Sequence, residues 1–78
     1  MVVLEEDCFK TVVGDLGYPI TDPLYKELMY IELYLQSYGI LLNTNFHFLN
    51  LYELRFNDEK AEFMFKLKYS NLINPKFQ

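Results

Sequence analysis

The sequence of 78 residues has no tryptophan, one cysteine, one histidine, three glycines and three prolines. A single cysteine cannot form a disulfide within the chain, and Cys8 with His47 supplies too few ligands for a zinc site, which takes four. No apolar run approaches the roughly 18 residues that span a bilayer. The start of the chain is acidic and lacks the basic residues of a signal peptide. We therefore expect no metal, no cofactor and no membrane partner.

Positive charge is also scarce, because seven Lys and Arg residues face eleven Asp and Glu residues, for a net charge of −4. A nucleic-acid partner would require clustered basic residues, so none is expected. Residues 1–39 carry a net charge of −5 and residues 40–78 a net charge of +1. Such asymmetry can orient a head-to-tail contact between chains. The other interpretation is two faces that differ only in their solvation.

About half of the residues are hydrophobic, and Phe and Tyr together number fourteen. A chain of this length is predicted to form one small domain over residues 1–78. A small core without a disulfide or a metal depends on dense apolar packing or on association with other chains. The residue types that AT-rich codons favour, such as Asn, Lys, Ile and Phe, are abundant. This composition is compatible with a viral origin. The missing signal-peptide pattern and the single thiol predict a cytoplasmic location, or the virion if the protein is viral.

Residues 4–16 have the periodicity of an amphipathic helix. Apolar side chains recur every four residues from Cys8 to Leu16, and this spacing places them on one helix face. The acids at 5–7 would occupy the first turn, where the helix dipole favours negative charge. Gly17 follows the last apolar residue and can adopt the left-handed conformation that ends many helices.

A second helix is predicted over residues 23–38. Asp22-Pro23 is typical of a helix start, since Asp caps the first turn and Pro has no N–H to leave unsatisfied there. Apolar residues then recur at alternating steps of four and three, which makes a single stripe on the helix surface. The stripe consists of Leu24, Leu28, Ile31, Leu35 and Tyr38.

The side of this helix opposite the stripe is also apolar. Met29 and Leu33 lie there, with Tyr30 and Tyr34 at its flank, where a surface helix would carry mostly charge. Aromatic and apolar side chains of this kind are typical of protein interfaces. We predict that these four residues contact another chain. The other interpretation is that the first helix and the C-terminal tail cover them.

Two strands are predicted over residues 46–56 and 61–69, because large apolar side chains alternate there with other residues. The polar segment 57–60 is short enough to connect them as a β-hairpin. Pairing Phe56 with Ala61 keeps the aromatic side chains of both strands on one face. The helix stripe would contact that face through Leu28, Ile31 and Leu35 against Phe48, Tyr52, Phe63 and Phe65.

The opposite face of the predicted hairpin has two notable features. Arg55 would lie opposite Glu62, an attractive cross-strand pair. Leu49 and Leu51 also fall on this face, which indicates either a bulge near residues 49–50 or a face that is itself covered. We include both leucines among the candidate interaction residues.

Together these segments predict an α+β fold of the order ααββ, with both helices packed on the aromatic face of the hairpin. The tail, residues 70–78, holds Leu72, Ile73 and Phe77 among polar neighbours. It is either an arm that docks on another chain or a tail that folds back on its own helices. Phe77 is a candidate interaction residue under the first alternative.

No constellation of residues indicates catalysis. His47 has no acid within three positions and no nucleophile that the sequence ties to it, so it lacks the partners of a general base. Cys8 lies on an apolar helix stripe beside acids, which disfavour a reactive thiolate. We therefore predict that the chain is not an enzyme and has no catalytic residue.

Three classes of function agree with these observations. The first is a non-catalytic interaction subunit, a structural or assembly component that associates with itself or with a larger assembly. The second is a small inhibitor or accessory protein that binds and blocks a larger host protein. The third is a small enzyme or ligand carrier. The short length, the missing catalytic groups and the excess of apolar surface favour the first two classes, and the first above the second.

Overall fold

The computed structural model describes residues 1–21 and 23–73, and it confirms the α+β class. The elements in chain order are β1 (Val2–Glu5), α1 (Glu6–Asp15), the 3-10 turn η1 (Leu24–Glu27), α2 (Leu28–Gln36), β2 (Ile40–Asn43), the 3-10 turn η2 (His47–Leu49), β3 (Leu51–Phe56) and α3 (Glu59–Lys68). The predicted ααββ order is wrong, because a strand precedes the first helix and a helix follows the last strand.

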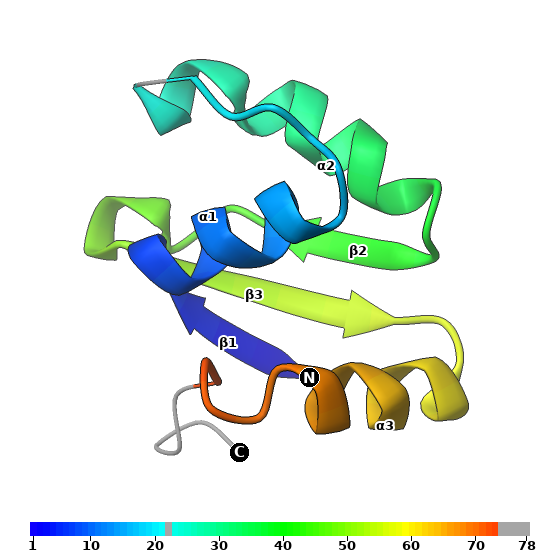
Figure 1. Ribbon diagram of the computed structural model, residues 1–78. Coiled ribbons are helices and arrows are strands. Elements are labelled where there is room, and N and C mark those ends of the chain that lie inside the picture. The colour runs from blue at the N-terminus through cyan, green and yellow to red at the C-terminus, as the bar shows by residue number, and fades with distance from the viewer. Residues whose placement is uncertain (22, 74–78) are drawn as a thin grey trace.

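The three strands form one antiparallel sheet in the order β1-β3-β2. The last strand in the sequence is therefore the central one, and it pairs with both of the others (Figure 1). Leu54 of β3 lies between Val2 of β1 and Leu42 of β2. This register places the even-numbered residues of all three strands on one face of the sheet, which we call the inner face.

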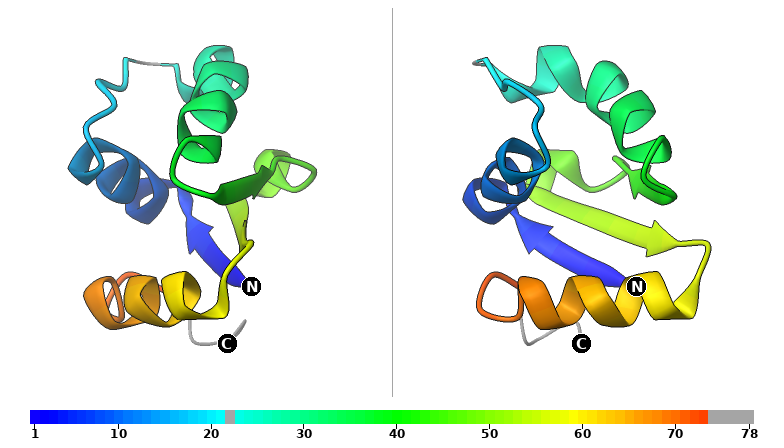
Figure 2. Two further views of the ribbon diagram at one scale, coloured as in Figure 1. Left: turned by 90° about the vertical axis from the view of Figure 1, so that its right-hand side faces the viewer. Right: turned by 45° about the vertical axis from the view of Figure 1, so that its right-hand side comes forward.

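The core lies between the inner face and the helices. Phe9 of α1 stacks on Tyr52 of β3 with ring centroids 4.3 Å apart, and Phe65 of α3 packs on Phe56 at 5.1 Å. The hydrophobic cluster joins strand and helix residues, among them Val2, Leu4, Phe9, Val12, Leu28, Ile31, Leu35, Ile40, Leu42, Tyr52, Leu54 and Phe65. The views in Figure 2 show that α2 and α3 lie at opposite ends of the molecule, with the strands between them.

The predicted first helix begins later than expected, because Val2–Glu5 pairs with β3 instead of joining the helix. The remaining periodicity is correct, since Val12 and Val13 are fully buried and Gly17 adopts a φ of 107° beyond the helix end. A short run of apolar residues at the start of the chain fits a strand as well as a helix turn. Pairing with a strand that is distant in the sequence determines which of the two structures forms.

The predicted second helix is present in a shorter and less regular form, a 3-10 turn followed by α2. Its predicted stripe is correct for Leu24, Leu28, Ile31 and Leu35, which are buried in the core, but wrong for Tyr38, which is 49% exposed. Gly39 adopts a φ of 75° and turns the chain directly from α2 into β2. The proposed capping by Asp22 lies outside the described residues.

The prediction of one strand over residues 46–56 is only partly correct. Residues 47–49 form a 3-10 turn, Asn50 adopts a left-handed φ of 60°, and the strand occupies Leu51–Phe56 alone. Asn is one of the few residue types that adopt this conformation readily. A second partner of β3, the strand Ile40–Asn43, was not predicted. A turn thus takes the place of the bulge that was one of the two alternatives here. The predicted contact of Phe48 with the helix stripe is wrong, because this side chain is exposed.

The prediction of a strand over residues 61–69 is wrong, since residues 59–68 form α3. The side chain of Asp58 caps the helix by accepting a hydrogen bond from the backbone N–H of Lys60 at 3.0 Å. Acids occupy the first turn and lysines the last, as the helix dipole favours. The predicted contact of Phe63 with the core is therefore also wrong, because this side chain is exposed.

The predicted hairpin pairing of Phe56 with Ala61 is also wrong, because Ala61 belongs to α3. Arg55 does not face Glu62 but bonds to Glu53 of its own strand, with 2.6 Å between Nε and Oε1. The side chains are two residues apart and so lie on the same face of the sheet.

Polar contacts tie α3 to the rest of the molecule. The Tyr69 hydroxyl donates to the Asp15 carboxylate, and the Lys68 ammonium lies 3.4 Å from the same group. The α-ammonium of Met1 donates to Glu62 at 2.7 Å. These contacts join α3 to the end of α1 and to the start of β1. The helix α3 lies beside β1 in every view (Figures 1 and 2).

Candidate functional site

The outer surface of α2 is the clearest candidate for a site. Met29 is 71% exposed and Leu33 is 59% exposed, and Tyr30 beside them is also largely exposed. These side chains point away from the core because the opposite side of the same helix is buried against β2 and the inner face. The structure therefore brings three of the predicted interaction residues together on one exposed surface.

Tyr34 does not belong to this surface. Its hydroxyl donates to the backbone carbonyl of Leu16 at 2.8 Å, and its ring packs edge-on against Tyr18 at 5.3 Å. The hydroxyl of Tyr38 also donates to the Leu16 carbonyl, at 3.0 Å. The neighbouring Tyr38 hydroxyl, and then partial burial, raise the pKa of Tyr34. Tyr34 is thus a contact between α2 and the end of α1, within the chain itself.

The position of Gly17 follows from the same contact. A β-carbon at Gly17 would lie 3.0 Å from the Tyr34 hydroxyl, and the φ angle of Gly17 is positive as well. Glycine therefore allows the hydroxyl of Tyr34 to approach the end of α1 closely.

The two predicted leucines of the sheet lie at a separate place. Leu49 and Leu51 line a hollow of about 350 Å³ together with Met1, Val3, Phe46 and Glu53. Val3 and Glu53 are odd-numbered strand residues, so this hollow lies on the face of the sheet opposite the inner face. It is distinct from the α2 surface, and Phe77, the last predicted residue, lies outside the described residues.

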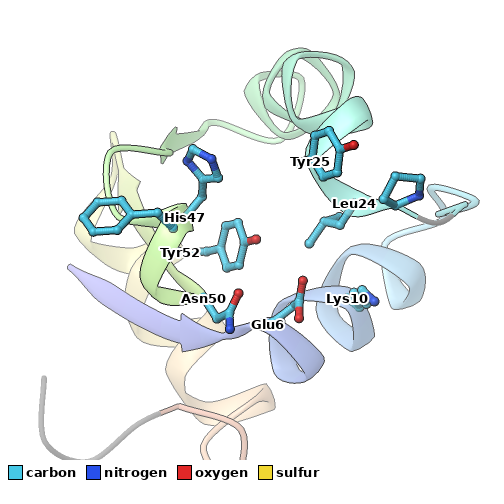
Figure 3. Close-up of a pocket in the computed structure, with 9 residues that line it drawn as sticks. Glu6, Lys10, Leu24, Tyr25, His47, Asn50 and Tyr52 are labelled. Atoms are coloured by element: carbon cyan, nitrogen blue, oxygen red, sulfur yellow. The ribbon is translucent and has the colours of Figure 1, made fainter.

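A cleft of about 520 Å³ was not predicted from the sequence. Its lining comes from four separate segments: α1, η1, η2 and β3 (Figure 3). Tyr52 stands at its centre and is 2% exposed, and its hydroxyl faces Glu6 and Lys10 of α1. The other lining residues are Pro23, Leu24, Tyr25, His47, Phe48 and Asn50. No local sequence pattern could have identified this site, because only the tertiary fold assembles it.

The chemistry of the cleft is that of hydrogen bonding. Burial raises the pKa of Tyr52, the negative charge of Glu6 raises it further, and Lys10 opposes this effect. Tyr52 therefore remains a protonated donor near neutral pH. His47 has its Nδ1 2.9 Å from the backbone carbonyl of Thr44, so this ring nitrogen is not directed by an acid, as it is in a catalytic dyad.

Cys8 and the acids give no further site. Cys8 is partly buried and lies beside Glu5, Glu6 and Asp7. Across residues 1–21 and 23–73, no group of three His, Cys, Asp or Glu side chains is placed to hold a metal ion. None of the helices in the described ranges is both long enough and apolar enough to span a bilayer.

A second exposed apolar surface lies on α3 and was also missed. Phe63 is 60% exposed and Leu67 is 61% exposed, and Met64 lies between them. The signal that could have identified it is the order of charges around this segment. A capping Asp, early acids and late lysines indicate a helix, and the helical spacing then places these three side chains on one side.

Comparison with known proteins gives no relative for this chain, because no protein-family model, curated protein or solved structure matches it.

Proposed function

We propose that this chain is a non-catalytic interaction subunit, a structural or assembly component that binds another protein chain through the outer surface of α2. The observation that carries the proposal is the exposure of Met29, Tyr30 and Leu33 on a helix whose opposite side is anchored in the core. Contiguous exposed apolar side chains on a small protein usually mark an interaction site.

The rival explanation of these residues is burial within the chain. It accounts for Tyr34, which packs on the end of α1. It does not account for Met29 or Leu33, which remain mostly exposed. Full burial of a side chain such as Met or Leu favours association by about 1.5–3 kcal/mol. Burial of two or three such side chains offsets part of the free-energy cost of the translational and rotational freedom that two chains lose on binding.

The test is the solution mass of the chain, measured by light scattering over a range of concentrations. We expect the wild type to exceed the 9.4 kDa of a single chain as the concentration rises. Leu33→Asp should remain folded and stay at that mass, because a buried carboxylate opposes the contact. Thr11→Asp adds the same charge on the exposed side of α1 and should associate like the wild type.

Two results would contradict the proposal. If Leu33→Asp unfolds the chain, this side chain is needed within the fold and the surface is not free. If Leu33→Asp folds and associates like the wild type, the α2 surface does not make the contact.

The non-catalytic part of the proposal rests on the surroundings of His47 and Cys8. His47 bonds to a backbone carbonyl, and Cys8 lies among acids. Substituting either residue by Ala should therefore leave association unchanged, apart from a small loss of stability for Cys8. A loss of association by either variant with the fold intact would show that the residue has a role the proposal omits.

A further inference from the structure

Two helices of this chain carry outward faces with the same spacing. On α2 the residues at i, i+3, i+4 and i+7 form what we call the α2 face: Met29, Glu32, Leu33 and Gln36. On α3 the same spacing gives the α3 face: Lys60, Phe63, Met64 and Leu67. This spacing makes a straight stripe about two turns long, which is the pattern by which helices pack on one another.

The two faces cannot meet within one molecule. The helices α2 and α3 lie at opposite ends of the structure in all three views, with the sheet between them (Figures 1 and 2). Both faces are nevertheless exposed at their apolar residues, with Leu33 and Leu67 about equally exposed. Any contact between an α2 face and an α3 face must therefore join two copies of the chain.

Charge distinguishes this contact from the two symmetric ones. In the described part of the chain Glu32 makes no ion pair, and neither does the ammonium of Lys60. Packing two α2 faces antiparallel would bring Glu32 toward its own copy, and packing two α3 faces would leave Lys60 with no acid opposite it. Only the mixed contact brings opposite charges together, and like charges at an interface reduce affinity.

We propose that the α2 face binds the α3 face of a second copy, with the two helices antiparallel. The inference rests on the proposed function and names the partner for it. In this orientation Leu33 lies against Phe63 and Met64, and Met29 lies near Leu67. Lys60 then lies beside the last turn of α2, one helical turn from Glu32 and within reach of its carboxylate, and this turn has no basic residue of its own. A cation is favoured there by the helix dipole.

This contact is heterologous, so each copy keeps one free α2 face and one free α3 face at the ends of a dimer. Further copies add head to tail and give a ring if the rotation closes, or a filament if it does not. Each face consists of only four side chains, whereas a stable interface takes roughly 20–30 residues a side. Association is therefore expected to depend on concentration instead of giving one tight dimer.

The experiment uses two variants that each destroy one face. Leu33→Asp removes the α2 face and Leu67→Asp removes the α3 face, and light scattering measures each variant alone and in an equal mixture. Each variant alone should remain at the mass of one chain. The mixture should form a dimer of one copy of each and grow no further, because only one intact pair of faces remains.

The outcomes separate this inference from the proposed function. If Leu67→Asp associates like the wild type while Leu33→Asp does not, the α2 face binds something other than the α3 face. The inference then fails and the proposed function survives. If both variants stay monomeric and the mixture does too, the inference also fails. If Leu33→Asp associates like the wild type, both fail.

A charge exchange provides a second test that leaves the apolar residues in place and so does not threaten the fold. Glu32→Lys alone should weaken association by up to about fivefold at low salt, the range of an exposed ion pair. Adding Lys60→Glu in the same chain should restore association, since the opposite charges again meet. Equal weakening in the single and double variants would overturn the proposed pairing.

Discussion

The helices α2 and α3 are nearly equal in length, yet they are held in different ways. Three residues of α2 are buried: Leu28, Ile31 and Leu35. Within α3 only Phe65 is buried, and Tyr69 and Ile73 just beyond the helix are buried as well. Ion pairs of Glu62 and Lys68 and the Tyr69 hydroxyl add polar contacts to the rest of the chain. One end of this small molecule is therefore held by apolar burial, while the other combines apolar burial with polar contacts that pH and salt can weaken.

The largest expected effect comes from breaking the apolar attachment of α2. Ile31 is completely buried, so Ile31→Ala should lower the free energy of unfolding by about 2–5 kcal/mol, as measured by urea denaturation. Leu33→Ala on the same helix is the control, and its effect should stay within about 0.5 kcal/mol because this side chain is exposed. Equal losses in the two variants would mean that the buried side of α2 has been assigned wrongly.

A smaller effect is expected at the start of α3. Asp58→Ala removes the side chain that caps the helix, and this should cost about 1 kcal/mol of unfolding free energy. The residue that precedes α2, Glu27, makes no capping bond to that helix. If Asp58→Asn, which keeps a capping oxygen, loses as much stability as Asp58→Ala, the cap is not the cause.

The polar contact at the other end of α3 should contribute less than the cap. Tyr69→Phe keeps the packing of the ring on Phe65 and removes only the hydrogen bond to Asp15. Asp15 is exposed and keeps Lys68 as a partner, so the melting temperature should fall only slightly. Tyr25→Phe, at an exposed ring on η1, is the control and should leave it unchanged. A large fall with Tyr69→Phe would show that this bond anchors α3 more than its exposure indicates.

The smallest effect concerns acid. The bond from Tyr69, followed by the interactions with Lys68, lowers the pKa of Asp15. The N-terminal ammonium, and then Lys66, lower the pKa of Glu62 in spite of its partial burial. A carboxyl group with a lowered pKa in the folded state stabilises it above the unfolded pKa of about 4, and this stabilisation is lost as the pH falls through the folded pKa.

Amide hydrogen exchange between about pH 5 and about pH 3 should therefore show α3 losing protection before α2. In the double variant Asp15→Asn, Glu62→Gln this difference in pH dependence should disappear. If α2 and α3 of the wild type lose protection together, the two helices are not attached in the different ways described.

The prediction of α2 from the sequence succeeded because a helix stripe is a local pattern. Leu28, Ile31 and Leu35 specify it without reference to the rest of the chain. The prediction of β1 failed for the opposite reason, since Val2–Glu5 pairs with residues about fifty positions later. A strand of four residues carries too little local information to be distinguished from a helix turn.

The segment of α3 was predicted to be a strand because its apolar residues fit both the two-residue period of a strand and the spacing of a helix. Phe63, Phe65 and Leu67 alternate as in a strand, and Phe63 with Leu67 also has the spacing of a helix. The capping Asp58 and the order of charges decide for the helix. The exposure of Met29, Tyr30 and Leu33 on α2 was predicted from the sequence, and that of Tyr34 was not correct. That this surface binds another chain stays a prediction. The cleft around Tyr52 could not be predicted, because it draws on four segments that only the tertiary fold brings together.

The central position of β3 has a consequence for the time course of folding. Because β1 and β2 pair only with this strand, the sheet cannot begin to form during synthesis until residues 51–56 have been made. Pairing across about fifty residues also slows folding relative to a chain of local contacts. Until then, the apolar side chains of Val2–Glu5 and Ile40–Asn43 have no strand partner. In that interval the nascent chain is most exposed to aggregation and to capture by chaperones.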